Sequence, residues 1–181
     1  RDRIYSESAG TITANGGTVT VTNAPAAGGA IYNKSGGSIV VDGGTVTATG
    51  DTGTAIYNAS ECSVVVKGGT VSASGNSSSS NFAIYSPNGG SIEVSGGTVS
   101  GDGVPAISNY SKPITITIKD GAVVTSTMVH TSMGTIYVNE VGSVLNVLGG
   151  TVENTADSGN VIYNREATVN ISGGTVSASG S

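Results

Sequence analysis

Hydrophobic and polar residues alternate with a period of two in many short segments of this chain. Thr45-Val46-Thr47-Ala48-Thr49 is representative. This period places Val46 and Ala48 on one face of a strand and the three threonines on the other. Residues 63–67 alternate in the same way, and residues 55–58 form another short strand. Because no stretch shows the 3.6-residue period of an amphipathic helix, the pattern predicts an all-β protein.

These segments recur about every 26 residues. A Gly-Gly-Thr-Val motif begins at Gly16, Gly43, Gly68, Gly96, Gly149 and Gly173, and Asp120-Gly121-Ala122-Val123 is a degraded copy in the one gap. An Ile-Tyr motif keeps step at Ile4, Ile31, Ile56, Ile84, Ile136 and Ile162, with Ile107-Ser108 standing in once. Self-similarity at such a period is the signature of a solenoid, which offers long repeated faces rather than one deep pocket.

The repeat predicts a parallel β-helix with three short strands per coil and about six to seven coils. Gly-Gly is expected at a corner, where the missing Cβ relieves crowding. The inside is predicted to hold three columns of apolar side chains. One contains Val19, Val46, Val71, Val99, Val123, Val152 and Val176; the second contains the seven Ile residues of the Ile-Tyr positions; the third contains Ile12, Ile39, Val64, Ile92, Ile116, Leu145 and Val169. Parallel crossovers favour a right-handed coil.

We expect residues 1–181 to form a single solenoid that is a piece of a longer repeat array. Length variation collects between the Val of one motif and the following Ile, which predicts a surface loop on one edge. The most divergent insert runs from Asn76 to Asn81. An Asn follows the Tyr position at Asn33, Asn58, Asn109 and Asn164, and stacked amides at equivalent corners would hydrogen-bond along the axis as a ladder.

Coils of this length, with Gly-Gly corners, Val and Ile columns and an Asn ladder, resemble the right-handed parallel β-helix of the pectate-lyase-like superfamily. The Gly-Gly-Thr-Val-Thr-Ala and Ala-Ile-Tyr-Asn repeats also resemble those of large surface-anchored bacterial proteins, some of them adhesins or carbohydrate-binding proteins. The resemblance covers the whole chain. It implies the fold and the handedness more strongly than any ligand, because function does not follow from fold.

Composition and charge narrow the function classes. The 181 residues carry a net charge of −5 with seven scattered Lys and Arg, which is unsuited to nucleic acid or to an anionic membrane surface. No apolar run approaches the ~20 residues that would span a bilayer. A single cysteine, Cys62, cannot form an internal disulfide, and it is interpreted as an incidental free thiol.

Catalysis is not expected, although the superfamily contains polysaccharide lyases and hydrolases. Such enzymes need clustered carboxylates, whereas Asp42, Glu93, Asp120 and Glu153 fall at different coils and coil positions. His130 has no evident nucleophile partner in the sequence. No cofactor is predicted; calcium stays a weak alternative through loop residues Asp51, Asp102 and Asp157, since an Asp beside Gly is usually a turn residue.

Two outward rows are candidate binding surfaces. Tyrosines recur at Tyr5, Tyr32, Tyr57, Tyr85, Tyr137 and Tyr163, interrupted by Ser108, and the last five are the candidate ligand-binding residues. Exposed aromatic rings can stack on sugars, or alternatively on each other to shield the sheet. The second row is hydroxylic: Thr18, Thr20, Thr22; Thr45, Thr47, Thr49; Thr70, Ser72, Ser74; Thr175, Ser177, Ser179. It resembles the faces of ice-binding proteins, although Thr also suits any solvated strand.

We therefore expect a non-catalytic bacterial module, extracellular or on the cell surface, that acts as a stalk or adhesin and binds carbohydrate. The alternatives are an accessory or degenerate domain of a polysaccharide-degrading enzyme and an ice-binding face. End-to-end self-association is also expected, because an open solenoid edge recruits another chain.

Overall fold

The repeats build a parallel β-solenoid of about six turns. The computed structural model describes residues 4–24, 28–76 and 81–179, and within these ranges every regular element is a strand. Counterpart strands of successive coils pair in parallel throughout, with Ile on Ile and Tyr on Tyr in most rungs. Three strand positions per coil, spaced by the 26-residue repeat, confirm the predicted fold class.

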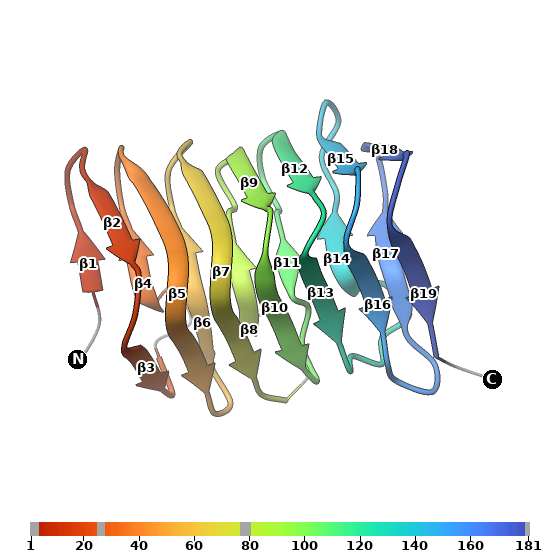
Figure 1. Ribbon diagram of the computed structural model, residues 1–181, viewed down its shortest axis with the longest axis horizontal. Helices are drawn as coiled ribbons and strands as arrows, with labels where there is room; N and C mark the ends of the chain where they lie inside the picture. The colour runs from red at the N-terminus through yellow and green to blue at the C-terminus, as the bar shows by residue number, and fades with distance from the viewer. Residues whose placement is uncertain (1–3, 25–27, 77–80, 180–181) are drawn as a thin grey trace.

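The strands form two sheets that face one another across the core, one in front and one behind in Figure 1. The rear sheet is built from the Ile-Tyr segments. Its strands are β1 (Ile4–Ser6), β4 (Gly29–Asn33), β6 (Gly53–Asn58), β8 (Asn81–Tyr85), β11 (Ile107–Ser108), β14 (Gly134–Val138) and β17 (Asn160–Asn164).

The front sheet contains the other two strand positions of each coil. Its strands are β2 (Thr11–Ala14), β3 (Thr18–Thr22), β5 (Ser38–Thr49), β7 (Ser63–Ser74), β9 (Gly90–Val94), β10 (Gly97–Asp102), β12 (Ile114–Ile118), β13 (Ala122–Ser126), β15 (Val144–Val147), β16 (Thr151–Asn154), β18 (Thr168–Ile171) and β19 (Thr175–Ala178). Front strands descend and rear strands rise as the chain advances from left to right, which makes the coil right-handed (Figure 1).

The core is a set of columns that run along the solenoid axis. The second and third predicted columns are confirmed in register, and their interior members are buried. Ile31, Ile56, Ile84, Ile107 and Ile136 are fully buried, whereas Ile4 at one end of the second column is 40% exposed. Ile39, Val64, Ile92, Ile116 and Leu145 form one continuous register. Burying a Val or Ile side chain contributes about 1.5–3 kcal/mol, so these columns are the main source of stability.

The first column departs from prediction at one rung. Val124, not Val123, lies beside Val99 and Val152 and is fully buried, while Val123 pairs with Thr98 on the outer face. The degraded motif places one more residue between its glycine and the inward Val than the intact motif does. Because side chains alternate between faces, that single residue exchanges inside for outside.

The Gly-Gly pair is a corner in some coils and a bulge in others. In β5 and β7 the strand continues through it, and the pairing register shifts between Val41 and Asp42 and again before Thr45. Gly44 has φ 70°, and a Cβ there would lie 2.6 Å from the carbonyl oxygen of Gly17 in the preceding coil. Glycine is therefore required both by the backbone conformation and by the close stacking of coils.

The predicted asparagine ladder exists over part of the solenoid. Asn33 Nδ2 donates to Asn58 Oδ1 (3.1 Å), and Asn58 Nδ2 donates to Ser86 Oγ (3.0 Å) in the next coil. In later coils the asparagine side chains bond to the backbone instead. Asn109 Nδ2 donates to the Lys112 carbonyl, and Asn164 Nδ2 donates to the Ala167 carbonyl. Serine replaces asparagine at residue 86, so the ladder is mixed rather than uniform.

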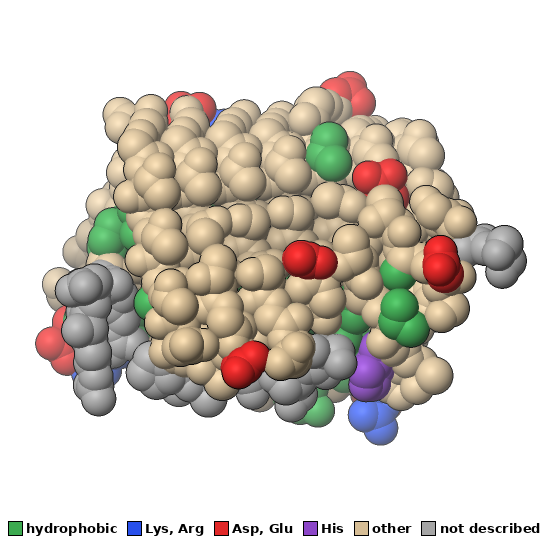
Figure 2. Space-filling model, turned by 90° about the horizontal axis from the view of Figure 1, so that it is seen from below, with side chains coloured by type: hydrophobic (Ala, Val, Ile, Leu, Met, Phe, Trp, Pro, Cys, Tyr) green, Lys and Arg blue, Asp and Glu red, His purple; other side chains and the backbone are tan. Residues whose placement is uncertain are grey.

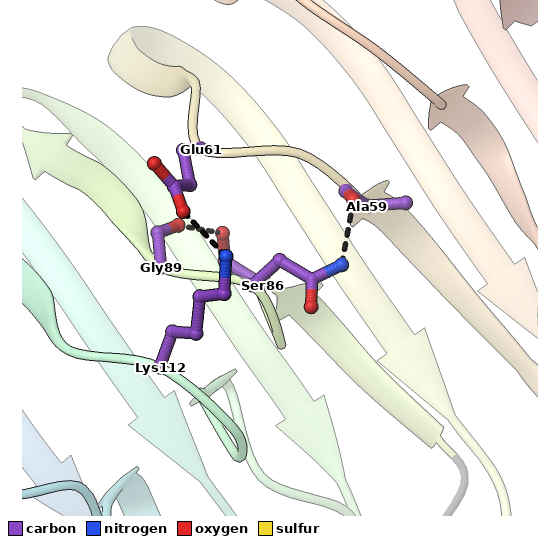
Figure 3. A network of polar contacts seen from close by, with 6 residues as sticks. Ala59, Glu61, Ser86, Gly89 and Lys112 are labelled. Atoms are coloured by element: carbon purple, nitrogen blue, oxygen red, sulfur yellow. Dashed lines mark hydrogen bonds and ion pairs between the residues drawn. The ribbon is translucent and has the colours of Figure 1, made fainter.

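The same corner ties three successive coils together (Figure 3). Asn88 Nδ2 donates to the Ala59 carbonyl (2.7 Å), and Lys112 reaches across that coil to Glu61 (2.6 Å). The other two ion pairs between described residues, Lys34–Glu7 and Lys119–Glu93, each join adjacent coils. Each pair is at least one-third exposed and contributes little singly, but all three oppose slippage between coils.

Candidate functional site

The tyrosine row lies on the outer face of the rear sheet. Tyr5, Tyr32, Tyr57 and Tyr85 occupy one register column, as do Tyr137 and Tyr163. The exposed fraction of these side chains decreases from the first coil toward the interior coils. Tyr5 is 43% exposed, Tyr32 to Tyr85 are half-buried, and Tyr137 is only 5% exposed. The row is therefore less accessible than an outward position on a strand suggests.

The rings stack on one another rather than facing solvent. Centroids of Tyr5 and Tyr32 are 5.3 Å apart with the planes 10° from parallel, and Tyr32 and Tyr57 are 5.0 Å and 20° apart. Tyr137 and Tyr163 are 5.5 Å and 5° apart. Tyr57 and Tyr85 instead meet edge to face, with centroids 5.2 Å and planes 81° apart. Where the rings are parallel, their faces turn along the axis, so most of the faces that would stack on a sugar already contact another ring.

Two aromatic residues outside the motif complete this surface. Tyr110 stacks on Tyr137 (5.9 Å, 15°), and Phe82 stacks on Tyr85 (4.6 Å, 20°). Ser108 was predicted to interrupt an outward row, but its side chain is fully buried, and the ring of Tyr110 joins the stack from two residues further along. Neither aromatic residue belongs to the repeated Ile-Tyr pair, so the motif alone did not identify them.

Burial changes the acidity of the row. It raises the pKa of Tyr85 to about 12, with smaller contributions from the neighbouring phenols, and it also raises the pKa of Tyr57 and Tyr137. Neutral phenols packed in a column are consistent with the structural alternative considered for this row, in which the rings shield the sheet.

The hydroxylic residues line a trough on the front sheet, which we call the hydroxyl trough. It encloses about 390 Å³ and extends over four coils. Its walls are the outward pairs Thr47 and Thr49, Ser72 and Ser74, Ser100 and Asp102, and Thr125 and Thr127, with Thr155 at one end. Its floor is the strand backbone at Ala48, Ala73, Gly101 and Ser126. Regular rows of uncharged side chains along the long axis are visible in Figure 2.

Strict register produces this trough. Thr47, Ser72, Ser100 and Thr125 are consecutive partners in the parallel ladder. Rungs are about 4.8 Å apart, so four rungs give a trough roughly 15 Å long. The residues between the two rows of hydroxyls point the other way, into the core: Ala48, Ala73 and Ser126 are at most 3% exposed. Because side chains alternate between the faces of a strand, the space between the two rows stays open.

The trough hydroxyls make hydrogen bonds within the protein but keep unused donor or acceptor sites. Thr47 Oγ1 and Ser72 Oγ hydrogen-bond to each other, and Thr127 Oγ1 donates to Asp102 Oδ1 (2.8 Å) while accepting from the Gly103 N–H. A hydroxyl has one donor and two acceptor sites, so a single bond leaves capacity for a ligand. Asp102 provides a carboxylate at the rim, and Glu153 follows Thr125 in register at one end.

A second cavity lies between two of the variable loops. It encloses about 750 Å³ and is lined by Val129, His130, Thr131, residues 157–160 and Ala178. His130 Nδ1 accepts from the Ser132 N–H (3.0 Å), and Asn160 Nδ2 donates to the carbonyls of His130 and Met133. The imidazole is thus fixed by local turn contacts, and Asp157 is the one carboxylate in the lining.

The variable loops are held by asparagine side chains. Asn81 Nδ2 donates to the Asp51 carbonyl (3.0 Å), and Asn154 Nδ2 donates to the carbonyls of Met128 and Asn160. Of the predicted divergent insert, residues 77–80 lie outside the described residues. The loops are consequently bonded to neighbouring coils where the structure describes them.

Asp51 and Asp102 bond to the next coil, whereas the Cys62 thiol is bonded within its own turn. Asp51 Oδ1 accepts from Asn76 Nδ2 (2.7 Å), and Ser60 Oγ donates to Cys62 Sγ (3.0 Å). Across residues 4–24, 28–76 and 81–179, no group of three or more His, Cys, Asp and Glu side chains could hold a metal ion. Calcium binding stays a prediction without a cluster of ligands to support it.

No protein-family model, curated protein or solved structure matches the chain. A search of the described residues for a helix long and apolar enough to cross a membrane also found none. The site must therefore be interpreted from its own geometry.

Proposed function

We propose that this chain is a non-catalytic module of a bacterial cell-surface or secreted protein, a stalk that binds neutral carbohydrate in the hydroxyl trough. The observation that supports this proposal best is the trough itself, which runs along the solenoid axis. The adhesin-like repeats and the pectate-lyase-like likeness of the sequence support the same class of function by resemblance.

The continuous ladder suits a stalk. Strand pairing joins each coil to its immediate neighbours, so stiffness accumulates along the axis. Core columns pass through all coils, and the three ion pairs each join one coil to another. Such a module would act as a rigid spacer that bears load, while its outer faces remain available for binding.

The chemistry of the trough favours an uncharged sugar chain. Ring hydroxyls of a hexose can donate to and accept from Thr and Ser hydroxyls, and Asp102 can accept from a sugar diol. The rung spacing of about 4.8 Å is close to the length of one hexose residue, so successive residues would meet equivalent groups. Asp102, Glu153 and the net charge of −5 would repel an acidic polysaccharide.

The tyrosine row is a weaker candidate for the same ligand. Most of its rings stack on neighbouring rings, Tyr85 meets Tyr57 edge to face, and Tyr137 is nearly buried. We therefore assign Tyr32, Tyr57, Tyr85, Tyr137 and Tyr163 to the stability of the rear sheet in this proposal.

Affinity electrophoresis tests the proposal. The chain would be run in native gels containing xylan, mannan, β-glucan or polygalacturonate. Thr47→Val, Ser72→Ala, Ser100→Ala and Thr125→Val together remove four trough hydroxyls with little change in shape. We expect at least one neutral polysaccharide to retard the parent chain, polygalacturonate to have no effect, and the quadruple variant to migrate as in an empty gel.

The same sheet offers a matched control. Thr11, Ser63, Ser91 and Thr115 belong to another outward hydroxyl column, one that lies outside the trough. Thr11→Val, Ser63→Ala, Ser91→Ala and Thr115→Val make the same chemical changes there and should leave retardation intact. Equal retardation of both quadruple variants would reject the trough as the site, and no retardation by any neutral polysaccharide would reject carbohydrate binding.

The regular hydroxyl rows also favour one rival, ice binding. A flat lattice-matched face would inhibit ice recrystallisation, whereas Val123 and Glu153 interrupt the rows here. Inhibition of recrystallisation that is lost in the trough variant would replace carbohydrate by ice as the partner.

A further inference from the structure

Tyr32 and Tyr57 are the closest pair of tyrosine rings among the residues that the structure describes. Their centroids are 5.0 Å apart and their planes 20° from parallel, whereas the other contacts between two tyrosines range from 5.2 to 5.9 Å. The pair lies on interior coils, because β4 and β6 each have a paired strand on both sides in the rear sheet. Its geometry is therefore set by the repeat itself.

Backbone register holds the two side chains next to each other. Tyr32 and Tyr57 are direct partners in the parallel pairing of β4 with β6. The preceding partners are Ile31 and Ile56, both fully buried, and the following partners are asparagines whose side chains hydrogen-bond at 3.1 Å. Contacts on both sides of the pair thus oppose separation or slippage of the two strands, and the rings stay adjacent.

The pair also lies on the outer face of the sheet. Both side chains are half-buried, so a small oxidant can reach the phenols and the rings have room to tilt. Tyr137 stacks on two other tyrosines but is only 5% exposed, which leaves it little such room. Proximity within one chain raises the effective concentration of one phenol at the other far above that supplied by a second molecule.

We propose that Tyr32 and Tyr57 are a site of oxidative cross-linking, at which hydrogen peroxide and a haem peroxidase convert the two phenols to dityrosine. Each phenol loses one electron and its hydroxyl proton and becomes a phenoxyl radical. The two radicals form one carbon–carbon bond between a Cε atom of each ring, and the hydrogen on each of these carbons moves to the phenol oxygen. The peroxide accepts the two electrons and two protons, its O–O bond breaks, and two molecules of water are released.

This bond supplies a covalent link between coils. Cys62 is the one cysteine of the chain, so no intrachain disulfide can join two coils. Dityrosine closes the segment from position 32 to position 57 into a loop, which restricts the unfolded chain as a disulfide does. The cross-link therefore reinforces the solenoid, and it does not depend on a ligand in the trough.

Two chains that keep two tyrosines each test the pairing. The first keeps Tyr32 and Tyr57, and its other tyrosines are replaced: Tyr5→Phe, Tyr85→Phe, Tyr110→Phe, Tyr137→Phe and Tyr163→Phe. The matched control keeps Tyr32 and Tyr85 and carries Tyr57→Phe in place of Tyr85→Phe. Its two phenols are two rungs apart, about 9.6 Å, with a phenyl ring between them. Circular dichroism confirms that both chains fold.

Both chains receive hydrogen peroxide and a haem peroxidase over a series of protein concentrations. Dityrosine is measured by its fluorescence and by the loss of two hydrogen atoms from the mass of the monomer. We expect the first chain to form it at least about tenfold faster than the control, at a rate per chain that does not depend on protein concentration. Equal rates in the two monomers, or dityrosine found only in dimers, overturn the proposal.

The unaltered chain gives a second measurement that needs no multiple variant. Cleavage after Lys34 and Lys67 separates the two tyrosines into different peptides, so mass spectrometry of the oxidised monomer can detect the cross-link and fragment ions can assign it. We expect a Tyr32–Tyr57 product that Tyr57→Phe removes and Tyr163→Phe leaves in place. Oxidised monomer without this product overturns the proposal.

Melting of the oxidised chains tests the consequence of the bond. The cross-linked first chain should melt about 5–10 °C above the same chain before oxidation, because the closed loop lowers the entropy of the unfolded state. The control chain after the same treatment should keep its melting temperature. A first chain that contains dityrosine and melts no higher than before overturns the reinforcing role of the cross-link.

Discussion

The tyrosine row and the hydroxyl trough are both outward columns of one repeated residue type, on opposite sheets of the same solenoid. They differ in what their side chains do with their neighbours. Large flat rings at about 4.8 Å spacing fill the space between rungs and pack against one another, most of them face to face. Small hydroxylic side chains at the same spacing leave that space open. The same periodicity therefore yields a closed surface in one sheet and a concave one in the other.

The largest expected effect comes from a change beneath both surfaces. Ile84→Asp places an unpaired charge in a fully buried column and should destabilise the protein by about 4 kcal/mol or more. Ile84→Val should cost about 1 kcal/mol. Urea unfolding measures both values, and an aspartate variant as stable as the valine variant would contradict the inside–outside assignment.

The core column that contains Ile84 was predicted residue by residue, because the Ile-Tyr motif is spaced almost rigidly from the next Gly-Gly. The sequence was also sufficient for the parallel register and the hydroxyl rows. It was insufficient at the degraded motif, where one inserted residue moved Val124 inward. It did not predict ring orientation, since whether tyrosines face solvent or each other depends on side-chain packing between coils. Tyr110 and Phe82 were missed because they stand outside the repeat.

Removing the rings should distinguish the role of the tyrosine row from that of the hydroxyl trough. Tyr57→Ser, Tyr85→Ser and Tyr137→Ser together should lower the free energy of unfolding by on the order of 1–2 kcal/mol per ring, from lost stacking and burial. Glycan retardation should persist in the fraction that remains folded, because the trough is untouched. A melt and an affinity gel on the same sample measure the two outcomes.

The trough variant supplies the reverse test. The quadruple hydroxyl change should melt within a few degrees of the parent chain while losing retardation. If the tyrosine variant instead keeps its stability and loses retardation, the roles of the two surfaces are exchanged and the site is the tyrosine row.

A smaller effect tests which valine belongs under the hydroxyl face. Val124→Ala removes part of a fully buried side chain and should cost about 2 kcal/mol, whereas Val123→Ala changes an outer position and should cost less than about 0.5 kcal/mol. Thermal or urea unfolding of the pair resolves this difference. Equal costs, or a larger cost at Val123, would contradict the register observed at β13.

The smallest expected effect is a pH dependence confined to the tyrosine row. The Tyr85 phenol has a pKa near 12 in the folded chain and about 10 when unfolded. A raised folded-state pKa contributes stability that is complete below pH 10 and is lost as the pH rises from 10 toward 12. Tyr85→Phe removes this titrating group and should retain more of its neutral-pH stability in that window. The trough variant keeps every phenol and should lose stability as the parent does. Melting curves between pH 8 and pH 12 measure the effect, and identical alkaline losses in the parent and Tyr85→Phe chains would show that the phenol is hydrated rather than packed in the stack.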